Sequence, residues 1–359
     1  MDEVHSPATS DATDRSLFIL LPPSVNDMTL GLSNAELSTG RQHLLDLMVK
    51  LLDTGVQAYV DIPQIAVIGS QSAGKSSLIE AIAGITLPRA SGTCTRCPTE
   101  CQLRTASSPW TCTVVLRCTK DLHGEVMGEP LMIPFGSPIM SKDKVEERIR
   151  RAQRAILDPS TNYKKFLDGD DEDPPRPETR FSTNCVSLQI SGIGVANLSF
   201  CDLPGLIASV SGGHTGDIDL VKKNLVSSYI SSPSCIILLT IACKSDFEVQ
   251  GAHWLAKEYD PAGKRTIGVL TKPDRIPAGE ESRWLSFIHN KEEPLEHGWF
   301  CVKQPSSNEL KKGITWHEAR ENETRFFSTT SPWRDLTRLT RSISGHPILL
   351  TGQVRCSRA

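Results

Sequence analysis

The feature that most constrains the fold is a glycine-rich loop between a short apolar run and a helix-forming run. The run Ile65–Ile68 predicts a buried strand, and the residues up to Ala83 are rich in Ala, Ile and Leu, as expected of a helix. The loop between them, GSQSAGKS from Gly69 to Ser76, fits the pattern G-x-x-x-x-G-K-[ST] in its required strand-to-helix setting. The sequence therefore predicts a P-loop with a nucleoside triphosphate as its ligand.

The residue types of this loop suit phosphate and Mg²⁺. Gly69 and Gly74 allow the main chain to turn its N–H groups inward, and the positive end of the following helix faces the same point. Lys75 is then expected to reach the β- and γ-phosphates, and the Ser76 hydroxyl to bind Mg²⁺. A plain Gly/Ser turn is the alternative, and the complete motif in its setting disfavours it.

Charge and hydropathy exclude several other classes of protein. The chain has 359 residues and a net charge of -3 at pH 7, so it lacks the overall basic field that predicts nucleic-acid binding. No apolar run approaches the roughly 18–20 residues of a membrane span, and the N-terminus shows no basic-then-apolar signal. We expect an intracellular, cytoplasmic protein, with a peripheral position at an organelle membrane left open.

Two stretches resemble metal sites, and their spacing argues against both. Cys94, Cys97 and Cys101 are close together, but no histidine lies near them and a structural zinc site needs four ligands at paired spacing. The acidic stretch 168–177 lacks the EF-hand spacing and its final Glu. We expect reduced, unliganded thiols, in line with an odd total of 11 cysteines, and a solvated surface loop.

The order of segments predicts one α/β domain behind an N-terminal tail. Residues 1–32 are rich in Asp, Ser, Thr and Pro and are expected to be mobile, and a capping-box pattern at Ser33–Glu36 begins a helix that runs to Gly55. Strands then alternate with helices, which predicts a P-loop NTPase fold with a mostly parallel sheet and helices on both faces. The segment 110–118 is expected to pair with the strand before it. Besides 65–68, the expected strands end the segment 87–104 and cover 110–118, 186–190, 198–201, 235–241, 265–270 and 299–303, and the expected helices cover 141–157, 218–230, 249–259, 281–290 and 316–325.

Two further loops follow apolar strands. Asp202 begins Asp-Leu-Pro-Gly directly after the strand 198–201, where P-loop enzymes place the carboxylate that orients Mg²⁺. Gly205 leaves room for its N–H group to meet the γ-phosphate. The motif TKPD, residues 271–274, follows the strand 265–270. Because ligands of such sheets bind at the carboxyl ends of the strands, we expect the three loops to converge.

The TKPD motif predicts guanine as the base. Guanine presents an N1–H and an N2 amino group side by side, and the single carboxylate of Asp274 can accept from both. Adenine has no such pair of donors, so it would leave a desolvated carboxylate without a partner. The stem of Lys272 can lie along the face of the base. A TKPD turn that only caps a strand is the alternative.

Together these motifs resemble the GTPase domain of the dynamin superfamily, with the fungal dynamin and Mx-like group as the closest likeness. The resemblance rests on GSQSAGKSS at 69–77, on LPR with TRCP between 87 and 98, on DLPG at 202–205 and on TKPD at 271–274. It covers about Ser33 to Trp333, including FFS and SPW near the end. It implies GTP as substrate, Mg²⁺ as cofactor and pairing of two such domains.

The resemblance also implies roles for individual residues. Thr95 would be the switch threonine that holds Mg²⁺ and the attacking water, and Gln71 and Ser72 would be catalytic residues inside the P-loop. Ser72 would further bind a monovalent cation, K⁺ or Na⁺, with the main-chain carbonyls of Ala90 and Gly92. The other residues implied in the nucleotide site are Ser70, Ala73, Ser77 and Thr271, with Lys303 and Gln304 in the loop that closes over the base and ribose.

Leu206 supports a catalytic role for Gln71, independently of the family resemblance. Ras-type proteins place a water-orienting glutamine directly after D-x-x-G, and here that position holds a leucine, which cannot orient water. Gln71 in the P-loop is a reasonable substitute. A bound cation can likewise replace an arginine finger electrostatically.

The sequence also departs from the family pattern. Ala90 stands where a glycine is usual, and Cys97 replaces the second arginine of T-R-R-P. We place the GTPase domain at 33–334, because family members continue from S-P-W into a long helical stalk, whereas residues 335–359 show no apolar period. A misassigned gene end and a functional short isoform are both compatible with that tail.

Two hypotheses for the function follow. The first is a GTPase that yields GDP and phosphate and is stimulated when two G domains form a homodimer. The second is a stalkless GTP-binding module that pairs with full-length dynamin-like partners and regulates their assembly. Asp274 disfavours an ATP-dependent kinase. The resemblance also implies membrane remodelling, the family's usual task, and microtubule binding. Membrane remodelling is not carried over without qualification, because the chain shows no basic patch, lipid-binding domain or stalk. We expect neither nucleic-acid binding nor direct membrane contact by this chain alone.

Overall fold

A computed structural model of the chain describes residues 64–88, 95–168, 177–193, 195, 198–206 and 220–336. Several expectations lie outside these residues. They concern the tail 1–32, the helix from Ser33, most of the acidic stretch 168–177, the residues Ala90, Gly92 and Cys94, and the tail after 336.

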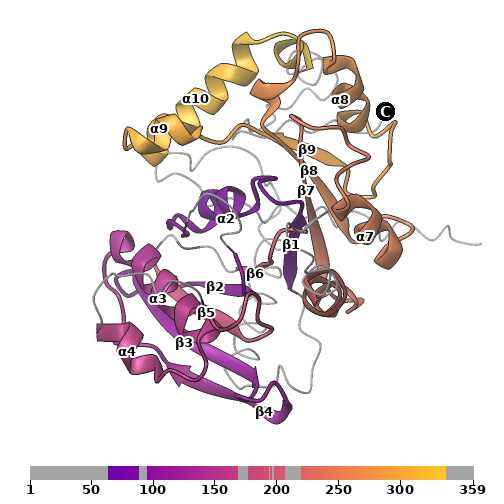
Figure 1. Ribbon diagram of the computed structural model, residues 1–359. Helices are drawn as coiled ribbons and strands as arrows, with labels where there is room; N and C mark the ends of the chain where they lie inside the picture. Colours follow the sequence, from indigo (N-terminus) through magenta and orange to yellow (C-terminus); the bar gives the residue numbers. More distant parts are fainter. Residues whose placement is uncertain are drawn as a thin grey trace, which may run out of the picture.

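The described strands form one nine-stranded sheet in the order β4-β3-β5-β2-β6-β1-β7-β8-β9 (Figure 1). Five of its pairings are parallel and three are antiparallel, so the predicted mostly parallel α/β fold is confirmed. The strands are β1 (Ile65–Gly69), β2 (Thr99–Thr105), β3 (Thr111–Lys120), β4 (Val126–Pro134), β5 (Cys185–Gly192), β6 (Leu198–Asp202), β7 (Ile236–Ala242), β8 (Thr266–Thr271) and β9 (Trp299–Val302).

Strand β1 lies between β6 and β7, runs parallel to both, and is buried along its whole length. Its side chains alternate between two hydrophobic clusters. Ala66 and Ile68 belong to one cluster, and Ile65 and Val67 belong to the other. Both faces of the sheet are therefore covered, which is why the strand reads as a continuous apolar run in the sequence.

Helices cover the two faces of the sheet. Figure 1 shows α3 (Val145–Leu157) and α4 (Tyr163–Asp168) beside β2, β3 and β5, and α8 (Glu281–Ile288) and α10 (Trp316–Thr329) near β9. No helix in the described ranges has both the length and the apolar character needed to cross a membrane. The other helical segments are α2 (Lys75–Ala83), η2 (Lys142–Lys144), η3 (Leu220–Val226), α6 (Ser227–Ile230), α7 (Ala252–Tyr259), η4 (Pro273–Arg275) and α9 (Ser307–Lys311).

The pairing predicted for the segment 110–118 is wrong. Strand β3 pairs with β4 and β5, and β5 lies between β3 and the preceding strand β2. Six of the eight residues of β5 are buried, which fits an interior position, although the strand comes later in the chain. The sequence reasoning also missed β4, α4 and α9. Strand β4 forms an exposed edge and therefore lacks the apolar alternation that marks a half-buried strand.

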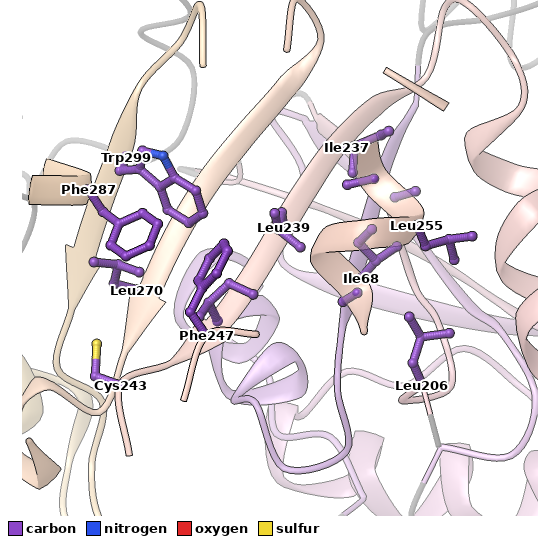
Figure 2. Close-up of a cluster of buried hydrophobic side chains, with 14 of the residues drawn as sticks. Ile68, Leu206, Ile237, Leu239, Cys243, Phe247, Leu255, Leu270, Phe287 and Trp299 are labelled. Carbon is purple, nitrogen blue, oxygen red and sulfur yellow. The ribbon is translucent and has the colours of Figure 1, made fainter. Parts of the chain in front are cut away.

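An aromatic group fixes the end of the sheet that carries β8 and β9. Phe287 packs against Phe247 and Trp299, with ring centroids 4.5 and 5.2 Å apart (Figure 2). The indole of Trp299 also lies over Gly268, its partner in the neighbouring strand. A Cβ on Gly268 would come within 2.2 Å of the indole, so only glycine allows this packing.

We expect Gly268→Ala to lower the free energy of unfolding by about 1–3 kcal/mol, because the added methyl group displaces a packed indole. Urea unfolding measures this change. Gly128→Ala is the matched control, since Gly128 also lies in a strand but faces open space. Equal stability of the two variants would contradict the packing described for Trp299.

Candidate nucleotide-binding site

The P-loop joins β1 to α2 through two glycines that the structure requires for different reasons. A Cβ at Gly69 would lie 2.6 Å from the carbonyl oxygen of Thr240, so this glycine permits close approach of β7. Gly74, the N-cap of α2, has φ +99°, a left-handed conformation that favours glycine. Ser72 also has a positive φ, at 62°. The turn predicted from the spacing of the glycines is present.

Main-chain contacts fasten the P-loop to the loop after β6. The N–H of Gln71 donates to the carbonyl of Leu206 at 3.3 Å, and the N–H of Leu206 donates to the carbonyl of Gly69 at 3.1 Å. A Cβ at Gly205 would lie 2.9 Å from the Cα of Gln71, so glycine lets the two loops touch. The Leu206 side chain points the other way, into the hydrophobic cluster beside Ile68 (Figure 2).

Lys75 places its ammonium group against the main chain of the loop. Its Nζ donates to the carbonyl oxygens of Gly69 and Ser70 at 3.3 and 3.4 Å, and the residue is buried. Its positive charge lowers the pKa of Asp202, which burial raises. A buried ammonium group beside backbone dipoles and a helix N-terminus makes the loop suitable for an anion.

Asp202 draws three distant segments together. Its Oδ2 accepts a hydrogen bond from Ser76 at 2.9 Å and one from Thr95 at 3.3 Å. Its Oδ1 is buried and has no hydrogen-bond partner among the described residues. Burial raises the pKa of Asp202, while Lys75 and the two hydroxyl groups lower it. A carboxylate and two hydroxyls with one oxygen left over are hard oxygen donors that fit Mg²⁺.

The TKPD motif contacts the P-loop from the other side. The hydroxyl of Thr271 donates to the carbonyl of Ala73, and the ammonium of Lys272 donates to the carbonyl of Ser72, each at 2.6 Å. Burial and nearby Lys244 lower the pKa of Lys272. Asp274 lies further out, with its carboxylate 3.6 Å from the Nε of Arg275. An exposed carboxylate at this edge is open to a base.

Gln304 reaches the P-loop from the end of β9. A Cβ at Gly74 would lie 3.0 Å from the Oε1 of Gln304. The Nε2 of Gln304 is buried, and no described residue accepts a hydrogen bond from it. The neighbouring N–H of Lys303 donates to the Oε1 of Glu323 at 2.8 Å. Gln304 therefore offers an unused donor beside the loop.

The structure brings most of the predicted site residues together at one edge of the sheet. Asp274 and Lys303 lie beyond the P-loop contacts, and Ser77 is half-buried on α2. Cys97 is a buried free thiol whose pKa burial raises to about 12. The residues that contact one another through these loops are Gly69, Ser70, Gln71, Ser72, Ala73, Gly74, Lys75, Ser76, Thr95, Asp202, Gly205, Thr271, Lys272 and Gln304.

Two residues of this region were missed from the sequence. Thr240 is fully buried opposite Gly69, and its hydroxyl has no partner in the described part of the chain. Its signal was a single hydroxyl in the apolar run 235–241. Glu323 holds the main chain of Lys303 from α10, and nothing in its local sequence indicates a contact so far along the chain.

Comparison with known proteins gives consistent matches. The family model described as "Dynamin family" matches residues 65–273. "Interferon-induced GTP-binding protein Mx" of Dicentrarchus labrax is 32% identical over 284 residues, which are 79% of this chain and 39% of that protein. "Interferon-induced GTP-binding protein Mx3" of Oncorhynchus mykiss is 33% identical over 283 residues, with 79% and 40% covered.

The chain spans between 36% and 40% of the length of these and similar relatives, such as Mx2 of Sus scrofa at 32% identity over 81% of this chain. Among solved structures, a chain of an oligomerised bacterial dynamin pair is 15% identical, with a TM-score of 0.36, over 78% of this chain and 38% of its own length.

We expect Asp202→Asn to stabilise the nucleotide-free chain by about 1 kcal/mol at neutral pH. The folded state holds the proton of Asp202 more tightly than the unfolded state does, because its pKa is raised above the ordinary 3.8. Ionisation therefore reduces stability as the pH rises above that value. Asparagine keeps an oxygen that accepts from Ser76 and does not ionise.

Urea unfolding between about pH 4 and about pH 8, without nucleotide or Mg²⁺, measures this difference, which should shrink toward the acidic end. Asp246→Asn makes the same charge change at an exposed position and should leave stability unchanged within about 0.5 kcal/mol. An Asp202→Asn variant less stable than the wild type at neutral pH would refute this account of the site.

Proposed function

The chain belongs to the dynamin family, and on that premise we propose that its P-loop site binds GTP and hydrolyses it to GDP and phosphate. The observation that carries the proposal is the junction at Asp202, where Ser76 of the P-loop helix and Thr95 share one carboxylate oxygen. A chain that only needed a turn at this point would not bury a carboxylate with an oxygen left unpaired.

Three side chains would hold Mg²⁺: Ser76, Thr95 and Asp202. When bound, Mg²⁺ neutralises charge on the β- and γ-phosphates. The unpaired Oδ1 of Asp202 supports this assignment, because a cation offsets a burial that raises the pKa of the carboxyl group. Lys75, beside the main-chain oxygens of the loop, would bind the phosphates themselves.

Guanine is the proposed base, and Asp274 its recognition residue. The exposed carboxylate of Asp274 can accept from both donors of guanine, whereas adenine would leave it unpaired. Lys272 supports this placement, since its bond to Ser72 fixes the TKPD motif against the P-loop. The amide nitrogen of Gln304, which has no partner in the described part of the chain, lies beside Gly74 and would bind the base or ribose.

For hydrolysis, we assign the attacking water to Thr95 and to the P-loop. Leu206 turns its side chain into the core and has no group that orients water. Gln71 bonds to the same loop through its main chain, and its Cα lies close to Gly205, which supports a role for Gln71 next to the γ-phosphate. Ser72 would bind K⁺ or Na⁺ there, and positive charge at that point would stabilise the transition state.

Phosphate release with GTP and with ATP, over a protein dilution series in K⁺ and then in Li⁺, tests the function. We expect release from GTP alone, a specific activity that rises with protein concentration as two domains pair, and faster release in K⁺. Equal rates with ATP would refute guanine selectivity. GTP binding without phosphate release would support the alternative, a GTP-binding module. A specific activity that does not depend on protein concentration would refute stimulation by pairing, and one that is equal in K⁺ and Li⁺ would refute the monovalent cation.

We expect Lys75→Ala to weaken GTP binding at least about 30-fold, because a buried charge that pairs with phosphate contributes about 2–5 kcal/mol. Isothermal titration with a non-hydrolysable GTP analogue measures the change. Lys291→Ala removes an exposed lysine and should bind as the wild type does. Unchanged affinity of Lys75→Ala would exclude the P-loop as the phosphate site.

Thr95→Ala should separate binding from turnover. The variant keeps Lys75 and the loops that hold the base, so its affinity for GTP should change by less than about threefold, while phosphate release falls by about 100-fold or more. Single-turnover phosphate release measures this. Thr329→Ala, on α10 and away from the P-loop, is the control. Normal turnover by Thr95→Ala would remove this residue from the machinery.

A further inference from the structure

One side chain of helix α10 holds the segment that follows β9. The Oε1 of Glu323, in the middle of the helix, accepts from the main-chain N–H of Lys303 at 2.8 Å. The helix itself is firmly placed. A capping box at Thr315 begins it, and Phe326 and Phe327 pack into the core one turn after Glu323. The carboxylate therefore has a fixed support.

The residue that Glu323 holds is the neighbour of Gln304. Strand β9 ends at Val302, so the direction of Lys303 decides where Gln304 lies. Gln304 in turn approaches Gly74, with its amide nitrogen buried and without a partner among the described residues. Two steps thus connect a helix outside the nucleotide site to the start of α2.

We propose that Glu323 is a positioning residue for the nucleotide: through the N–H of Lys303 it keeps Gln304 over the P-loop, and it does so best as a carboxylate. The inference rests on the proposed function, since it names a further residue that serves the same site. Glu323 does not touch the nucleotide. A charged acceptor holds an N–H more strongly than a neutral one, so affinity follows the ionisation of Glu323.

The surroundings of Glu323 bring its ionisation near neutral pH. Burial raises its pKa to about 7, against the opposing effects of its bond to Lys303 and of the charges of Arg320 and Lys303. Burial, with a smaller electrostatic effect of Glu323, raises the pKa of Cys301 on β9, which remains a neutral thiol. The carboxylate forms as the pH rises through about 7, and nucleotide affinity should rise with it.

The test compares the affinity for GDP of the wild type, Glu323→Gln and Glu323→Ala by isothermal titration with Mg²⁺, at about pH 6 and about pH 8. Glutamine keeps a neutral acceptor of the same shape and does not titrate. We expect wild-type affinity to exceed that of Glu323→Gln about fivefold at the higher pH and to match it at the lower. Glu323→Ala should be weaker than both.

Two comparisons keep the result specific. The phosphates of GDP also titrate, but they do so equally in every variant, so the difference between wild type and Glu323→Gln isolates the carboxyl group. Glu321→Gln removes the same charge from an exposed site on the same helix and should behave as the wild type does. Thermal unfolding of each variant shows whether it is folded.

The outcomes separate this inference from the proposed function. A wild type that does not bind GDP overturns both. If the wild type binds GDP, and the folded Glu323→Gln and Glu323→Ala variants bind it as tightly as the wild type does at both pH values, only the role of Glu323 is overturned. A loss shared by Glu321→Gln would show a general charge effect, and it would also overturn that role.

Discussion

The buried carboxylate of Asp202 is the contact on which the site depends. It stands at the end of β6, and it joins the start of α2 to Thr95 through two hydroxyl groups on one oxygen. Alone, such a group would destabilise the fold, because burial disfavours its charge. The nearby Lys75 and the hydroxyls offset part of that penalty, and one oxygen has no partner among the residues that the structure describes. The chain therefore maintains a locally unfavourable group at the point where a cation would be needed, as functional sites commonly do.

The P-loop is held in shape by its neighbours rather than by itself. Leu206 bonds to it from the end of β6, while Thr271 and Lys272 bond to it from the end of β8. Each of these bonds is made to the main chain of the loop, so none of them uses a side chain of the loop. A loop ordered in advance does not have to lose conformational entropy when it binds. Leu206 serves in two ways, since its backbone closes this contact and its side chain fills the core.

How much the sequence predicted follows from the range of each interaction. The P-loop, Asp202 and the TKPD motif could be found because each depends on a short local pattern after an apolar strand. Strand β5 could not be placed between β2 and β3, because its position depends on burial by both neighbours, and exposed β4 carries no apolar signal. In the site, the only sequence signal of Thr240 is a hydroxyl group within an apolar run. Glu323 left no signal, since its partner Lys303 is 20 residues earlier in the chain, just after β9.

Gly74 is where the P-loop lies against both Thr271 and Gln304. Any side chain there would contact both Gln304 and Thr271, in a backbone conformation that already favours glycine. The glycine of the P-loop motif thus has a second role, since it lets the two loops that follow β8 and β9 close on the start of α2. Because Gln304 follows Lys303, and Lys303 is held by Glu323, the same contact extends to α10. The P-loop and α10 are thus joined by two contacts, one from Glu323 to Lys303 and one from Gln304 to Gly74, with a peptide bond between them. Under the proposed role of Glu323, a change at that helix would reach the nucleotide without passing through the sheet.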